Sequence, residues 1–133
     1  MNHWSNDVVT FDDQSPIYRQ IAEAITREIL SGTLAEEEQV MSTNQYATFY
    51  RINPATAARA FQHLVDEGVL YKKRGIGMFV SPGAREQLRA SHRARFVSDV
   101  LVPMLDEARA IGLSLADVID LLQANADTED TDQ

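Results

Sequence analysis

The stretch that most limits the fold of this chain runs from residue 42 to residue 80, because it carries start and stop signals for two short helices. Ser42-Thr43-Asn44-Gln45 has the pattern of a capping box, in which a serine and a glutamine each satisfy a backbone N–H at a helix start. Asn53 and Pro54 are favoured at the N-cap and the first position of a second helix. Gly68 suits the left-handed turn that ends such a helix.

Two β-prone runs follow the second expected helix. Val69-Leu70-Tyr71-Lys72-Lys73 and Met78-Phe79-Val80 flank Arg74-Gly75-Ile76-Gly77, which has the glycines of a tight turn. A helix, a turn, a second helix and a basic hairpin together predict a winged helix-turn-helix. The expected fold is therefore mainly α with a small β-hairpin.

The second helix of this motif has two different faces. A periodicity of about 100° per residue places Ala57, Ala60, Phe61 and Leu64 on the side of the core. The opposite face is small and polar with one long cation, and consists of Ala55, Arg59 and Gln62, with Thr56 and Ala58 at its margins. Small side chains admit close approach to a DNA groove, and an arginine can bond two acceptors of a guanine. The alternative is an ordinary solvated helix face.

The tip of the hairpin carries three consecutive cations, Lys72, Lys73 and Arg74, followed by Gly75. The glycine permits a positive φ and leaves room for a phosphate or a groove wall. Lysines also protect exposed edge strands from pairing, which is the alternative reading. Beside a helix-turn-helix, the arginine-glycine tip favours DNA contact.

The net charge of −8 is unusual for a protein that binds nucleic acid, so the distribution of charge matters. Residues 39–81 carry five Lys and Arg against two acidic residues, a net charge of +3. The acidity is concentrated in residues 36–38 and in the C-terminal Asp127, Glu129, Asp130 and Asp132. The acidic total therefore does not exclude a DNA partner.

No enzyme or metal site is expected from the residues present. The chain has no cysteine, and its three histidines match no ligand spacing. No serine, histidine and carboxylate set indicates a nucleophile, and no cofactor is expected. Since no apolar run approaches the ~20 residues of a membrane-spanning helix, we expect a cytoplasmic protein with no membrane partner.

The segment before residue 42 completes the first domain, which we expect to span residues 8–82. Residues 1–7 are expected to be frayed, and Val8-Val9-Thr10-Phe11 to form a short strand or an extended segment. Ser15-Pro16 predicts an N-cap and a first-turn proline. An apolar stripe at helical spacing follows and ends at Gly32; it consists of Ile17, Ile21, Ala24, Ile25, Ile29 and Leu30.

Residues 83–124 are expected to form a helical dimerisation region. A long helix is predicted over 84–111, with a kink or break near Leu101 because Pro103 interrupts it. Gly112 ends it, and Ser114 to Asp117 is a second capping box. The apolar seam of the long helix runs from Phe96 to Ile111, and its expected dimerisation residues are Val97, Val100, Leu101, Met104, Leu105 and Ala108. Such a surface needs a cover, which is either a partner subunit or the chain's own winged domain; we favour a dimer.

The C-terminal part also contains a group of arginines and an acidic stretch. Arg85, Arg89, Arg93 and Arg95 begin the long helix and either reach DNA phosphates or form a solvated face. Residues 125–133 are polar and acidic, and their composition predicts a disordered tail.

Several of these segments resemble the GntR family of bacterial transcriptional regulators over about residues 8–82. The similarity lies in Ser15-Pro16-Ile17-Tyr18-Arg19-Gln20-Ile21, the helix end at 29–32, residues 53–61, Gln62-His63-Leu64, residues 67–70 and residues 74–80. The short C-terminal part is similar to the YtrA-type subfamily. The resemblance implies a homodimeric DNA-binding regulator, commonly a repressor, on an inverted-repeat operator. It does not decide whether a small-molecule effector exists.

The chain departs from the family pattern at several positions. Met41-Ser42 stands where proline-serine is usual, Asn44 replaces a DNA-contacting arginine, and Arg51 replaces a turn glycine. Asn44 can read an adenine or contact a phosphate, so the operator cannot be taken from relatives. Ser42, Thr43, Asn44 and Asn53 complete the expected DNA-binding set. The alternative function is a winged helix that binds a protein without specific DNA binding.

Overall fold

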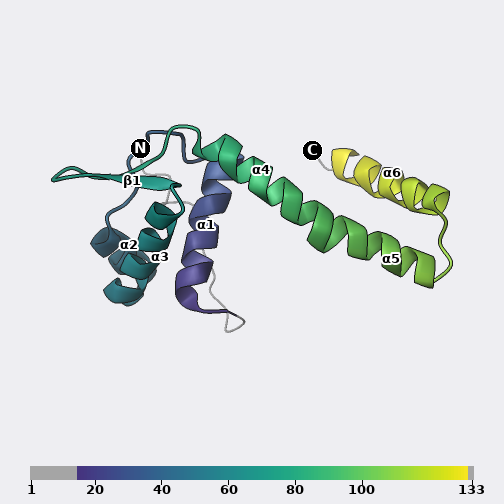
Figure 1. Cartoon of the computed structure of the whole chain (residues 1–133), viewed down its shortest axis with the longest axis horizontal. Helices are drawn as coiled ribbons and strands as arrows, with labels where there is room; N and C mark the ends of the chain where they lie inside the picture. Colours follow the sequence, from purple (N-terminus) through teal and green to yellow (C-terminus); the bar gives the residue numbers. More distant parts are fainter. Residues whose placement is uncertain (1–14, 132–133) are drawn as a thin grey trace. The chain divides into compact units, whose positions relative to one another are not determined.

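The structure is a computed structural model that describes residues 15–131, with side chains as far as Asp127 (Figure 1). The expected frayed start and the extended segment at residues 8–11 lie outside the described residues. The described chain divides into two compact units, with the boundary between Ala90 and Ser91.

Helix α1, Ile17–Ser31, opens the first unit and ends where expected, at Gly32 with φ +85°. The expected serine cap is wrong. Pro16 occupies the N-cap position with an extended ψ of 140°, and no side chain caps the helix. Ser15 therefore lies outside the helix, and its backbone carbonyl accepts a hydrogen bond from Gln20 Nε2 at 2.7 Å.

Helices α2, Thr43–Tyr50, and α3, Pro54–Asp66, form the expected pair. The capping box is confirmed: the Gln45 amide donates to Ser42 Oγ at 3.1 Å, and the Ser42 amide donates to Gln45 Oε1 at 3.0 Å. Asn53 Oδ1 accepts from the Ala55 amide at 2.8 Å, as expected of an N-cap. Arg51 turns the chain between the helices with a left-handed φ of +56°.

Strands β1, Leu70–Lys73, and β2, Gly77–Val80, pair antiparallel and project as a hairpin beside the three helices (Figure 1). Leu70 pairs with Val80 and Lys73 pairs with Gly77. An isolated bridge between Gln39 and Phe79 adds the loop before α2 to the edge of β2. The hairpin is thus supported along one side by that loop.

One core joins the helices to the base of the hairpin. Tyr46 and Phe61 are fully buried, and their rings meet edge to face with centroids 5.5 Å apart. The expected core face of α3 is confirmed, because Ala57, Ala60, Phe61 and Leu64 are all buried. Other buried members are Ile21, Ile25, Ile29, Leu34, Val40, Val69, Leu70 and Val80.

The core also includes the start of the next helix, α4, Ala84–Phe96. Ala84 and Leu88 are buried in the same cluster as the winged helix residues. The expected domain boundary at residues 82 and 83 is therefore too early. The glycine and proline at that boundary mark a turn within the first unit.

A π-helical turn, η1, Val97–Leu101, joins α4 to α5, Val102–Ala110. In it the Val102 amide bonds to the Val97 carbonyl, five residues earlier. The sequence predicts a kink or break near Leu101, and the structure has this π-helical turn there. Pro103 has no amide hydrogen to bond to the carbonyl four residues before it, so the regular α-helical hydrogen bonding is interrupted. The helical path continues through the proline.

Helix α6, Leu115–Thr131, lies antiparallel to α5 in the second unit (Figure 1). Its capping box is present: the Ser114 amide donates to Asp117 Oδ2 at 3.0 Å, and the Asp117 amide donates to Ser114 Oγ at 3.1 Å. The structure differs from the expected disordered tail, because residues 125–131 continue α6. No glycine or proline interrupts that stretch, so an established helix extends through it at little cost.

Within the described residues, no helix is long and apolar enough to cross a membrane.

Candidate nucleic-acid interface

The outward face of α3 is small and accessible. Ala55, Ala58, Arg59 and Gln62 are exposed, and Thr56 is partly buried. Gln62 Nε2 donates to Asp66 Oδ1 at 2.8 Å, so this amide is already paired with a carboxylate one turn later. Of the expected polar readers on this face, Arg59 has the longest reach.

Two more of the predicted DNA-binding side chains, those of Ser42 and Asn53, have hydrogen-bond partners within the protein. Ser42 Oγ and Asn53 Oδ1 each accept a backbone N–H at the start of a helix. Each cap uses one acceptor site, so the Ser42 hydroxyl and the Asn53 Nδ2 can still donate to a ligand. The same helix starts present Thr43, which is partly buried, and Asn44, which is exposed.

The three cations of the hairpin do not share one face. Successive strand residues point to opposite sides of a sheet, so Lys72 lies on the side of Leu70 and Lys73 on the side of Tyr71. Lys73 Nζ lies 4.5 Å from the centroid of Phe79 and 5.8 Å from that of Tyr71. This cation–π arrangement keeps the ammonium close to the hairpin.

The tip itself is an exposed turn. Arg74 and Gly75 are exposed, Gly75 has φ +77°, and the Ile76 amide closes the turn onto the Lys73 carbonyl at 3.0 Å. Gln39 Nε2 donates to the Ile76 carbonyl at 3.0 Å. The turn that carries Arg74 is therefore fixed by one hydrogen bond within the hairpin and by a second one from the loop before α2.

The sequence interpretation missed a group of residues at the junction of α1 and α3. Arg59 Cζ lies 3.9 Å from the ring centroid of Tyr18, and Arg19 Nε donates to the Tyr18 hydroxyl at 3.2 Å. The Arg19 hydrogen bond, with the charges of Arg19 and Arg59, lowers the pKa of Tyr18. One hint of this contact is present in the sequence: Tyr18 follows Ile17 and precedes Ile21, but it lies off the centre of the apolar stripe.

The predicted dimerisation residues are exposed to different degrees. Val97 and Val100 are exposed, whereas Leu101, Met104 and Leu105 are partly buried. Ala108 is buried within its own second unit, where it lines an apolar groove with Val118. The groove has a volume of about 400 Å³; its other lining residues are Met104, Glu107, Ile111, Leu113, Leu121, Leu122 and Asn125. Ala108 and Met104 therefore share this groove with α6 of their own chain.

No group of three His, Cys, Asp or Glu side chains that could hold a metal ion occurs in the part of the chain that the structure describes.

Known proteins with similar sequences belong to the class of regulators that the winged helix-turn-helix indicates. Residues 17–80 match the family model "Bacterial regulatory proteins, gntR family". The transcriptional repressor NagR of Bacillus subtilis is 39% identical over 72 residues, which are 54% of this chain and 30% of NagR. The repressor YtrA of the same organism is 27% identical over 101 residues, which are 76% of this chain and 77% of YtrA. The chain thus spans under a third of NagR but about three quarters of YtrA.

Solved structures similar to this chain cover residues of both units, and one of them contains DNA. A GntR family transcriptional regulator from Listeria monocytogenes superposes with a TM-score of 0.73 at 28% identity, over 86% of this chain and 98% of that one. The DNA-binding domain of AraR in complex with operator ORX1 has a TM-score of 0.50 at 26% identity, over 56% of this chain and 95% of that one. The winged helix-turn-helix of this chain, residues 17–80, belongs to the GntR family of bacterial regulatory proteins.

Proposed function

We propose that this protein is a repressor that binds an inverted-repeat operator as a homodimer and reads it with α3. The observation that carries the proposal is the exposed outward face of α3, with Arg59 on it, in the same compact unit as the basic hairpin tip at Arg74. Small side chains there permit entry into a major groove, and a hairpin can follow the adjoining backbone.

The division of labour between the two elements follows from their chemistry. Arg59 and Asn44 are exposed and can bond base edges, which carry the sequence information. Lys72, Lys73 and Arg74 are cations suited to phosphates, which fix position and affinity. Gly75 allows the turn to lie close to the duplex.

The proposal of a homodimer rests on the apolar surface of the second unit. Val97 and Val100 are 43% and 49% exposed, and Ile119 and Leu122 on α6 are 44% and 54% exposed. Apolar side chains in such number are costly in water and are typically covered by a partner subunit. A two-fold dimer presents two copies of α3, which matches an inverted repeat. Repression is supported by the names of NagR and YtrA.

In vitro selection from a random duplex library, followed by gel shift across a salt series, tests this function. The expected result is an enriched inverted repeat whose affinity falls steeply with salt, because bound phosphates release counterions. Arg59→Ala should cost about 1–3 kcal/mol on the selected duplex and little on a scrambled one. The matched control is Arg27→Ala, which removes an exposed α1 arginine paired with Glu23. A chain that enriches no sequence would instead favour a protein-binding winged helix.

A further inference from the structure

We propose that Tyr18 is a positioning residue for DNA recognition, which holds the Arg59 guanidinium ready to bond a base edge. The inference rests on the proposed function, in which the outward face of α3 reads the operator. It adds a residue of α1 to that reading surface.

The contact between the two residues is close. Arg59 Cζ lies 3.9 Å from the centroid of the Tyr18 ring, well within the ~6 Å at which a cation is attracted by an aromatic face. Tyr18 is the second residue of α1 and is partly buried, while Arg59 stays exposed. The two helices share the buried core through Ile21 and Ala57, so the ring and the arginine are carried by a rigid pair of elements.

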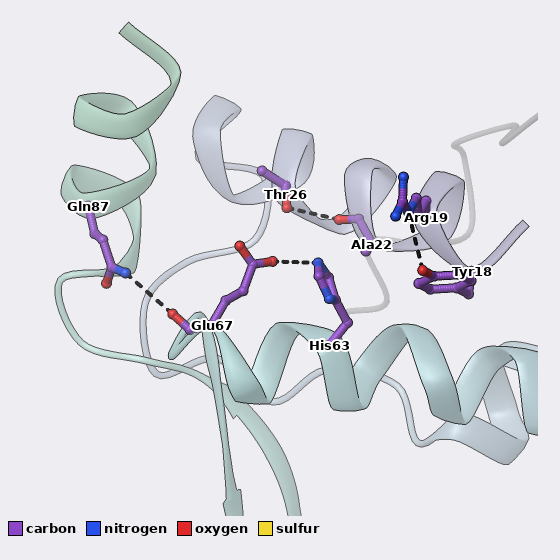
Figure 2. A network of polar contacts seen from close by, with 7 residues as sticks. All are labelled: Tyr18, Arg19, Ala22, Thr26, His63, Glu67 and Gln87. Carbon is purple, nitrogen blue, oxygen red and sulfur yellow. Dashed lines mark hydrogen bonds and ion pairs between the residues drawn. The ribbon is translucent and has the colours of Figure 1, made fainter. Parts of the chain in front are cut away.

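Neighbouring side chains fix the Tyr18 ring on two sides. Arg19 Nε donates to its hydroxyl at 3.2 Å, and the His63 ring meets it edge to face with centroids 6.3 Å apart. His63 lies one turn after Arg59 on α3, and its Nε2 lies 2.8 Å from Glu67 Oε1. Figure 2 shows Arg19 above the Tyr18 ring and His63 directed to Glu67. The aromatic platform under Arg59 is therefore restrained before any DNA arrives.

The geometry suits an arginine that must still form hydrogen bonds. The five N–H donors of a guanidinium lie in its plane, so a ring against its face leaves those edges available. Among the side chains of residues 15–127, no carboxylate forms an ion pair with Arg59 that would have to be broken. Holding a flexible side chain in place beforehand lowers the entropy lost on binding. Tyr18 thus raises affinity for the correct base without touching it.

The test compares Tyr18→Leu and Tyr18→Phe on two probes, the duplex selected by the wild-type chain and a scrambled duplex. Leucine removes the π face, so affinity for the selected duplex should fall about 3- to 30-fold, with little change on the scrambled one. Phenylalanine keeps the face and loses only the Arg19 hydrogen bond, so it should bind within about threefold of the wild type. Melting temperatures check the fold, and Tyr18→Met repeats the comparison if leucine lowers stability.

A double-mutant cycle separates positioning from a merely structural effect. In an Arg59→Ala background, Tyr18→Leu should cause no further loss on the selected duplex, because its arginine is gone. An equal loss in both backgrounds, or no loss in either, would overturn the role of Tyr18 while leaving the proposed function intact. A wild-type chain that selects no sequence would instead contradict the proposed function itself.

Discussion

Gln39 donates a hydrogen bond from its side-chain Nε2 to the backbone carbonyl of Ile76, at 3.0 Å, and so ties the loop before α2 to the tip of the hairpin. The same loop forms a β-bridge to Phe79. These contacts join the element that leads into the helix-turn-helix to the element that we expect to contact phosphates. The hairpin is therefore held in a defined direction.

Gly77 should be intolerant of a side chain for two separable reasons. Its φ is +144°, which L-residues rarely adopt, and an added Cβ would lie 2.5 Å from Gln39 Nε2. Gly77→Ala should therefore lower the melting temperature and weaken DNA binding. The added methyl would displace the end of the Gln39 side chain and break its hydrogen bond to Ile76, so Gln39→Ala in the Gly77→Ala background should lower the melting temperature little further. A further drop in the double variant as large as that of Gln39→Ala alone would show that the two residues act independently.

The hairpin cations should control salt dependence more than specificity. Replacing Lys73 and Arg74 together by alanine should weaken binding to every duplex and reduce the slope of log affinity against log salt by up to about 0.9 for each phosphate that is no longer neutralised. The matched control is Arg109→Ala, an exposed arginine of the second unit that pairs with Asp106 at 3.1 Å. If the double variant keeps the wild-type slope, the hairpin does not lie on the DNA.

Arg51 adopts φ +56° in the turn between α2 and α3, where a non-glycine residue costs roughly 1 kcal/mol. Arg51→Gly should relieve this strain and stabilise the first unit by about 0.5–1 kcal/mol, measured by denaturant unfolding. Arg51→Ala keeps the strain and removes the cation, so it shows whether the guanidinium contributes to DNA binding. If Arg51→Gly is no more stable than Arg51→Ala, the positive φ at this position does not cost the folded chain free energy.

The capping box at the start of α6 should make the second unit sensitive to acid. Hydrogen bonds from the Ser114 backbone and side chain hold the pKa of Asp117 below its usual range. A carboxyl with a lowered folded-state pKa contributes stability that is present above its unfolded pKa of about 3.9 and is lost as the pH falls through the folded value. Asp117→Asn keeps an acceptor without the charge, so its melting temperature should fall less over this pH range. If the melting temperatures of the wild type and of Asp117→Asn fall equally as the pH is lowered, the ionisation of Asp117 does not contribute to stability.

Local sequence signals predicted the parts of the fold that depend on neighbours along the chain. The capping box of Ser42 and Gln45 and the core face of α3 are confirmed because each is fixed by hydrogen bonds or periodicity within one helix. Pro16 shows the limit of such signals. A serine-proline pair fits either of two registers at a helix start, and only the packed helix decides between them.

Features that depend on distant contacts were not predictable in this way. Tyr18 and Arg59 are far apart in the sequence, and nothing in either helix alone indicates that their side chains meet. Leu88 belongs to the core of the first unit although it follows the proline-glycine turn. Residues 125–131 have an acidic composition typical of disorder, yet they extend a helix that the capping box at Ser114 has already started.

We propose that two copies of the chain join through the second unit and thereby read an inverted repeat. Val100 and Val102 offer a matched pair, because both are about half exposed and they lie on different sides of the helix. Val100 lies on the predicted seam and Val102 does not. A glutamate at either position meets solvent in a single chain, so neither variant should unfold it.

Sedimentation velocity and gel shift on the same preparations of Val100→Glu and Val102→Glu test this dimer. Val100→Glu would bury an unpaired charge at the subunit interface, at a cost of several kcal/mol, so it should sediment as a monomer. Its affinity for the inverted repeat should fall by orders of magnitude, since two linked half-site contacts become one. Val102→Glu should remain a dimer and bind normally. A dimeric Val100→Glu that binds its inverted repeat like the wild type would show that the subunits do not join through this seam.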